Sequence, residues 1–149
     1  MHTSVSPIVL VAMFAGILAL GAVVVAFRMR PTKPSRAALA VTASPPLIML
    51  ALFYSLAVHM HQSLGAWPAS IGERGFPAPL VTHAHIAAVY FSIVLLASIF
   101  AWPAIFLLCL VVRRWRGCVY YLGMYAFSSL VCFGAMLLAP SQFLYWWWD

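Results

Sequence analysis

Acidic side chains are almost absent from this chain of 149 residues, which has only two of them, Glu73 and Asp149. Charged residues of both signs make up 7% of the sequence, whereas 66% of the residues are apolar. An ordinary soluble domain has about a quarter charged residues and just under half apolar ones, so a soluble fold of this length has too small an interior for so much apolar surface. The composition therefore predicts a membrane protein and excludes a disordered chain and a nucleic-acid-binding module.

Cysteine is also sparse. The three cysteines are Cys109, Cys118 and Cys132, and no CxxC motif occurs. An odd number of cysteines in or beside apolar stretches argues against a disulfide framework. We expect three buried thiols that behave as small apolar groups.

The shortage of carboxylates excludes several classes of function. No Asp or Glu lies inside an apolar stretch, where proton-coupled and cation-coupled transporters generally carry one. The motifs GxSxG, Walker A, GxGxxG and HExxH are all missing. We therefore expect no catalytic residues, and an enzyme of this sequence would have to act through its histidines or a bound cofactor. A small channel or carrier remains an alternative, although no motif specifies a filter.

The basic residues divide the chain into four apolar stretches, each long enough to cross a bilayer, which takes about 20 residues. We expect transmembrane spans at about 7–27, 37–64, 80–112 and 118–138, with a turn-rich outer loop at 65–79. No repeat is visible and the length leaves no room for a second domain. The sequence thus predicts an all-α, integral membrane four-helix bundle forming one transmembrane domain over residues 1–149.

The positions of Lys and Arg predict the orientation of these spans. If the N-terminus lies outside, seven of the eight basic residues fall on the inner side, and Arg74 is the exception. This distribution follows the positive-inside rule. No Lys or Arg precedes Arg28, which argues against a signal peptide. We expect both termini on the outer, periplasmic side of a bacterial inner (plasma) membrane.

Prolines predict irregularities in two spans. Pro45 and Pro46 follow Ser44, so either a helix begins here with Ser44 as its N-cap or a longer helix is kinked at this point. The third stretch has 33 residues and would be about 50 Å long as one helix, compared with about 30 Å of hydrocarbon. It must project beyond the membrane or bend, and Pro103 is the expected bend.

Small residues and tryptophans predict how the spans pack. Helices in lipid associate through close fit, and small residues mark the contact faces. Small residues recur four apart in the first, third and fourth spans, in the sets Ala12–Gly16, Ala15–Ala19, Ala84–Ala88–Ser92, Ser128–Cys132 and Ala135–Ala139. Short inner loops would make the first two spans antiparallel neighbours, and likewise the last two. We expect Trp146, Trp147 and Trp148 to anchor the chain at the lipid interface.

Four histidines form the one convergence of chemically capable side chains. His59 and His61 end the second span, and His83 and His85 begin the third, so both pairs should lie at the same depth near the outer surface. Residues two apart on a helix point about 200° apart, so neither pair can chelate one metal ion from a regular helix. One histidine from each helix can meet instead. We expect His61 with His83, and His59 with His85 as the fallback pair.

Three interpretations of these histidines follow. One imidazole from each helix could ligate the iron of haem b, or several imidazoles with Glu73 could bind a divalent metal ion. In the third interpretation they are interfacial polar groups that bond to water, headgroups or backbone. The leading hypothesis for function is a non-catalytic accessory or stabilising subunit of a larger membrane complex, with membrane lipid and other membrane subunits as partners. The alternative is a haem- or metal-binding redox protein.

Overall fold

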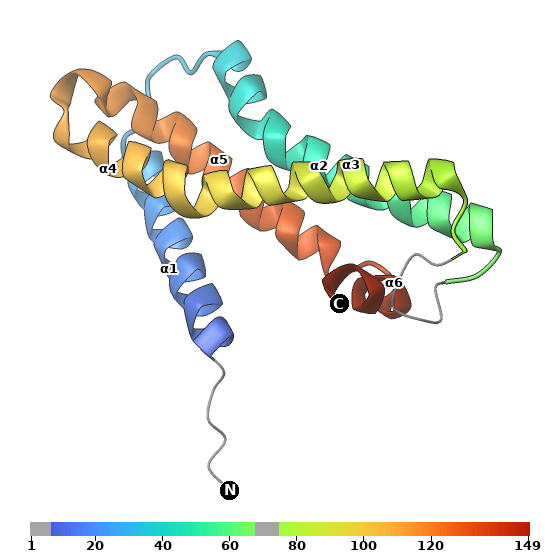
Figure 1. Cartoon of the computed structure of the whole chain (residues 1–149). Coiled ribbons are helices and arrows are strands. Elements are labelled where there is room, and N and C mark those ends of the chain that lie inside the picture. The colour runs from blue at the N-terminus through green and yellow to red at the C-terminus, as the bar shows by residue number, and fades with distance from the viewer. Residues whose placement is uncertain (1–6, 68–74) are drawn as a thin grey trace, which may run out of the picture.

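The computed structural model describes residues 7–67 and 75–149, and this part of the chain is helical and has no strands. Figure 1 shows the arrangement of the helices. The helices are α1 (Pro7–Arg28), α2 (Arg36–Leu64), α3 (Ala78–Leu96), α4 (Trp102–Val111), α5 (Val119–Met136) and α6 (Ser141–Trp148). Three helical stretches are long and apolar enough to cross a membrane, namely Arg36–Leu64, Ala78–Val111 and Arg113–Met136. The expectations of an all-α chain and of a membrane protein are confirmed at this level.

Helix α2 runs without interruption through Pro45 and Pro46. A proline has no N–H to donate to the carbonyl four residues earlier, which for Pro45 is the carbonyl of Val41. The Ser44 hydroxyl donates to that carbonyl instead, at 2.9 Å, and such side-chain bonds let proline remain inside membrane helices. Of the two alternatives at Ser44, the helix that begins there is not observed. The N-cap is Ser35, whose Oγ accepts the N–H of Ala38 at 3.3 Å.

The irregularity expected at Pro103 is a π-helical turn, Ala97–Ala101, between α3 and α4. In this turn the N–H of Trp102 donates to the carbonyl of Ala97, five residues earlier. The wider turn accommodates a proline ring that would otherwise press on the preceding turn. With it, α3 and α4 form one helical stretch of 34 residues.

The packing of α1 differs from the expectation that it would lie beside α2. Its main contacts are with α5, and it extends away from the other helices (Figure 1). A Cβ added to Gly123 of α5 would overlap the Cβ of Ala26 and lie 3.3 Å from the carbonyl oxygen of Ala22. The close contact is therefore made by Gly123 with Ala22 and Ala26. Gly16 does not take part, because a Cβ added to it would meet nothing within 4 Å. The side chains of Ala12 and Ala15 lie outside the described part of the structure.

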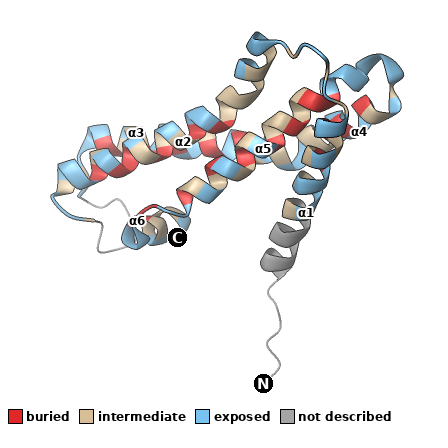
Figure 2. Cartoon of the chain, turned by 180° about the vertical axis from the view of Figure 1, so that it is seen from behind, coloured by how far each residue is buried: buried red, intermediate tan, exposed pale blue. Residues whose placement is uncertain are grey.

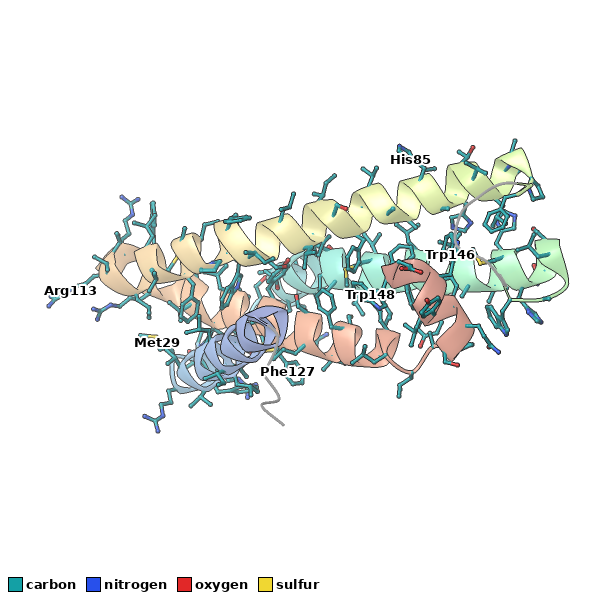
Figure 3. The ribbon with its side chains drawn as sticks, turned by 60° about the horizontal axis from the view of Figure 1, so that its bottom comes forward. Met29, His85, Arg113, Phe127, Trp146 and Trp148 are labelled. Atoms are coloured by element: carbon teal, nitrogen blue, oxygen red, sulfur yellow. The ribbon has the colours of Figure 1, made fainter. Side chains whose placement is uncertain are left out.

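Helices α2, α3 and α5 enclose the main core, which appears as the buried residues between them in Figure 2. Helix α2 contacts both α3 and α5. At one end α6 folds back against this core, and Phe143 becomes fully buried there. Figure 3 shows Met29 and Arg113 at the opposite end from His85, Trp146 and Trp148. The molecule therefore has a basic end and an aromatic end.

Candidate functional site: a histidine pair and an aromatic cleft

One histidine from each helix meets at the aromatic end, as expected, but the pair is His59 with His83. Their Nδ1 atoms are 2.9 Å apart, and the ring centroids are 5.2 Å apart with the planes inclined by 35°. The neighbouring Met60 is fully buried in the core, which fixes the rotation of α2. With α2 in this rotation, His59 faces α3 while His61 is exposed.

Ser55 extends the pair into a short polar chain. Its Oγ lies 3.1 Å from Nε2 of His83 and donates to the carbonyl of Leu52 at 3.0 Å. A neutral imidazole carries one N–H and one acceptor nitrogen. If the Ser55 hydroxyl proton is used for Leu52, then the Nε2–H of His83 donates to Oγ of Ser55, and Nδ1 of His83 accepts a hydrogen bond from the Nδ1–H of His59. The pair is hydrogen-bonded at both nitrogens of His83 in this arrangement.

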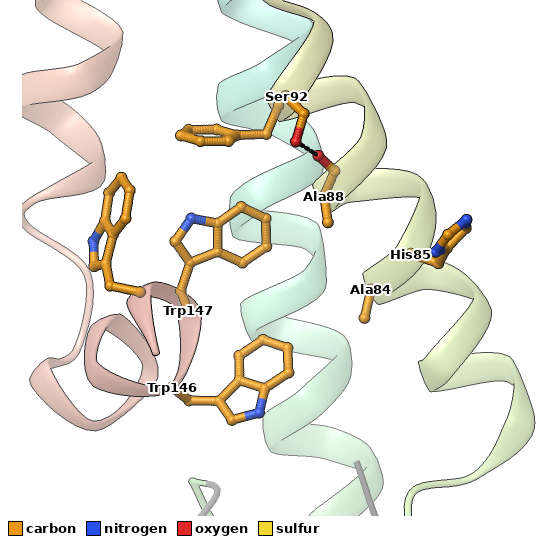
Figure 4. Close-up of a pocket in the computed structure, with 8 residues that line it drawn as sticks. Ala84, His85, Ala88, Ser92, Trp146 and Trp147 are labelled. Atoms are coloured by element: carbon orange, nitrogen blue, oxygen red, sulfur yellow. Dashed lines mark hydrogen bonds between the residues drawn. The ribbon is translucent and has the colours of Figure 1, made fainter. Parts of the chain in front are cut away.

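The other two histidines do not join this pair. His61 stacks on Trp67, with ring centroids 4.7 Å apart and an angle of 30° between the planes. His85 is exposed on α3, and its side chain points away from the indoles of α6 in Figure 4. The structure therefore brings together neither His61 with His83 nor His59 with His85.

The cofactor hypotheses can be compared with this geometry. Axial imidazoles lie on opposite faces of a haem, whereas the Nδ1 atoms of His59 and His83 are in direct hydrogen-bond contact. A zinc site needs three or four protein ligands, and residues 7–67 and 75–149 contain no group of three or more His, Cys, Asp or Glu side chains able to hold a metal ion. Glu73, the expected carboxylate ligand, lies outside the described residues. The described geometry fits a proton-sharing pair better than either cofactor.

An open cleft of about 360 Å³ lies between α3 and α6. Figure 4 shows Ala84 and Ala88 of α3 facing Trp146 and Trp147. The lining is completed by His85, Phe91, Ser92 and Trp148. The Ser92 hydroxyl is already bonded to the carbonyl of Ala88, at 2.8 Å. Hence the cleft is formed by indole rings on one side and by methyl groups on the other.

This cleft was not expected from the sequence, in which the three tryptophans were assigned to the lipid interface. Trp146 and Trp147 are half-buried, while Trp148 and Tyr145 are exposed. Trp147 packs edge-on against Phe53, with ring centroids 5.3 Å apart. The missed signal was the spacing of Phe143, Trp146 and Trp147, which places three aromatic residues on one helix face directly after Pro140.

Charge is distributed unequally between the two ends. All described Lys and Arg residues lie in or beside the two turns of the basic end, at Arg28, Arg30, Lys33, Arg36, Arg113, Arg114 and Arg116. The described carboxylate side chain is Asp149, which follows Trp148. Comparisons with protein-family models, curated proteins and solved structures find no match for this chain, so its function is argued from its own residues.

Proposed function

We propose that this protein is a small, non-catalytic accessory or stabilising subunit of a larger membrane complex. It lies in a bacterial-type inner membrane as a four-span protein, with both termini on the outer side. Its partners are membrane lipid and other membrane protein subunits. The observation that carries this proposal is the uncovered apolar surface of α1.

Helix α1 contacts the rest of the protein through Ala22 and Ala26, with Val25 packed beside them and Phe27 edge-on to the ring of Tyr120. Ala22 and Ala26 are buried against α5. Five large apolar residues of this helix are more than half exposed, namely Ile17, Leu18, Leu20, Val24 and Phe27. Lipid chains are as apolar as these side chains. The side chains are therefore equally favourable among lipids and against a neighbouring subunit. These five exposed side chains, beside a crossing formed by Ala22 and Ala26, suit a subunit that docks through α1.

The orientation is supported by the grouping of the basic residues. The turn between α1 and α2 and the turn before α5 lie side by side, because the N–H of Ser35 donates to the hydroxyl of Tyr121 at 2.9 Å. Seven basic residues therefore share one end of the molecule. Basic side chains of short loops are retained on the cytoplasmic side, which would place the aromatic end outside.

Complex formation is tested by placing a bulky residue on α1. The protein is extracted from its native membrane in lipid nanodiscs and its mass is measured by native mass spectrometry. We expect a complex of defined stoichiometry that Leu20→Trp disrupts and that Leu107→Trp, on an equally exposed position of α4, leaves intact. A particle containing only this chain and lipid would contradict the proposal.

Orientation is tested with the native thiols. Cys118 is exposed at the basic end, whereas Cys109 and Cys132 are buried. In intact cells we expect Cys118 to be protected from a membrane-impermeant maleimide until the membrane is permeabilised, and Ser63→Cys, at the other end of α2, to react at once. Cys118→Ser is the control for background labelling. The reverse pattern would overturn the orientation.

A metal-dependent redox role is a second candidate, favoured by the contact between His59 and His83. Two Nδ1 ligands at about 2.0–2.1 Å from a metal ion would need the rings to separate slightly from their present distance. An absorption spectrum and elemental analysis of the purified protein test this role, with His59→Phe as the variant that removes one ligand. Absence of both a Soret band and stoichiometric metal would eliminate it.

A further inference from the structure

The cleft between α3 and α6 is bounded by aromatic rings set at steep angles to one another. The ring of Phe91 is perpendicular to that of Trp147, at 90° with centroids 5.5 Å apart, and inclined by 77° to that of Trp148, at 5.7 Å. Trp146 lies 6.4 Å from Trp147 at 52°. Aromatic rings at steep angles around one space can form the walls of a box, and the face of each ring carries negative electrostatic potential.

The residues on the α3 side of the cleft are small and leave the space in front of the indoles unfilled. Ala84 and Ala88 are one helical turn apart and face the indoles (Figure 4). The cleft volume, about 360 Å³, lies at the lower end of the range of about 300–1,000 Å³ found for small-molecule sites. The space therefore suits a compact group rather than a protein helix.

The charge around the cleft favours a cation. The described Lys and Arg residues all lie in or beside the turns of the basic end, and the described carboxylate side chain, Asp149, follows Trp148 in the sequence. A cation bound among these rings would meet no described Lys or Arg side chain, and His85, which lines the cleft, points away from the indoles (Figure 4). An anionic group would have no described Lys or Arg side chain to pair with.

We propose that this cleft binds the quaternary ammonium headgroup of a choline phospholipid. Trp146, Trp147, Trp148 and Phe91 supply the aromatic walls, and Ala88 keeps the mouth open. A methylated ammonium group has no N–H to be satisfied and is attracted to aromatic faces, which matches a cleft lined by rings and methyl groups. A lipid headgroup can reach the site because α3 continues from the cleft into the stretch that is long enough to cross a bilayer.

Lipid selection is tested in nanodiscs of phosphatidylcholine and phosphatidylethanolamine in equal amounts. Lipids retained by the protein are counted by native mass spectrometry, and free tetramethylammonium is added as a competitor with sodium at the same ionic strength as the control. We expect retained phosphatidylcholine to exceed phosphatidylethanolamine by about tenfold, since several rings act together on one cation. Tetramethylammonium is expected to reduce the retained phosphatidylcholine.

Two matched pairs of variants test the cleft itself. Ala88→Leu fills the cleft, and Ala104→Leu adds the same side chain at an exposed position of α4. Trp148→Leu removes an exposed wall, and Tyr145→Leu alters an exposed ring of α6 outside the cleft. We expect the preference to fall to about twofold or less in the first member of each pair and to be unchanged in the second.

Several results would overturn the proposal. These are equal retention of the two lipids, no displacement by tetramethylammonium, retention of an unrelated protein in place of lipid, or an undiminished preference in both Ala88→Leu and Trp148→Leu. The proposal does not depend on the role of α1 as a docking helix. If the protein is found alone but selects choline lipids, the proposed function as a subunit is contradicted and the lipid site is supported. If the protein is found in a complex but shows no lipid selectivity, the proposed function is supported and the lipid site is contradicted.

Discussion

At the basic end α1 and α5 approach through residues with almost no side chain, whereas at the aromatic end α2, α3 and α6 interlock through the largest side chains in the sequence. The first contact depends on the missing Cβ of Gly123, next to Ala22 and Ala26. The second depends on Phe53, which contacts Phe143 and Trp147 at centroid distances of 5.0 and 5.3 Å.

The difference teaches how two kinds of helix contact can coexist in one small membrane protein. Small residues let helix backbones approach closely and gain dispersion energy along the whole contact. Aromatic side chains instead fill a wide gap between helices, and each contributes a large contact area. The first kind is sensitive to added volume and the second to removed volume.

Removing volume at the aromatic end should have the largest effect. Phe143 is fully buried, so Phe143→Ala is expected to lower the free energy of unfolding by about 3–5 kcal/mol and to release α6. Thermal unfolding in detergent and proteolysis at the C-terminal helix measure these effects. Tyr145→Ala changes an exposed residue of the same helix and should alter stability little. Equal effects of the two substitutions would mean that α6 is not part of the core.

Adding volume at the basic end should have the next largest effect. A methyl group at Gly123 overlaps Ala26, and Gly123→Ala is expected to cost about 1–3 kcal/mol and to loosen α1. Gly134→Ala on the same helix meets nothing within 4 Å and should be neutral or slightly stabilising, because alanine favours helix. Thermal unfolding distinguishes the two. Destabilisation by Gly134→Ala alone would contradict the assigned crossing point.

A polar link between α2 and α5 should contribute less than either packing contact. The Tyr54 hydroxyl donates to the carbonyl of Ala135 at 2.7 Å. Hydrogen bonds between membrane helices contribute about 0.6 kcal/mol on average, so Tyr54→Phe should lower stability by about that amount. Tyr145→Phe, on an exposed ring, is the control. A loss as large as that of Phe143→Ala would show that polar links, rather than packing, hold the aromatic end.

The histidine pair should have the smallest effect on stability, and spectroscopy is its better readout. His59→Phe removes one half-buried hydrogen bond, worth about 0.5 kcal/mol. In nitrogen-15-labelled protein we expect coupling between the Nδ1 atoms of His59 and His83 through a shared proton. That signal should vanish in His59→Phe and persist in His61→Phe. Its absence in the unmodified protein would remove the proton-sharing pair.

The sequence predicted the helical character and the ends of the long apolar segments well, because hydropathy and proline act locally. It predicted that one histidine from α2 would meet one from α3, but the residue expected on α2 was His61, and the residue observed is His59. The rotation of α2 depends on the burial of Met60 between neighbouring helices, and a period of 3.6 residues does not specify which neighbour a face will meet. The cleft was missed for a related reason: the fold-back of α6 depends on Phe143 finding a place beside Phe53.

The sequence by itself determined that this chain belongs in a membrane and that its basic residues group between apolar stretches, since transfer from water to lipid is a sum over each segment's own side chains. Only the tertiary structure decided that α1 crosses α5, that His59 contacts His83, and that three consecutive tryptophans divide between core and cleft. Lipid and protein interiors are equally apolar, so the choice of neighbours rests on small differences in fit, and those differences exist only once the helices are assembled.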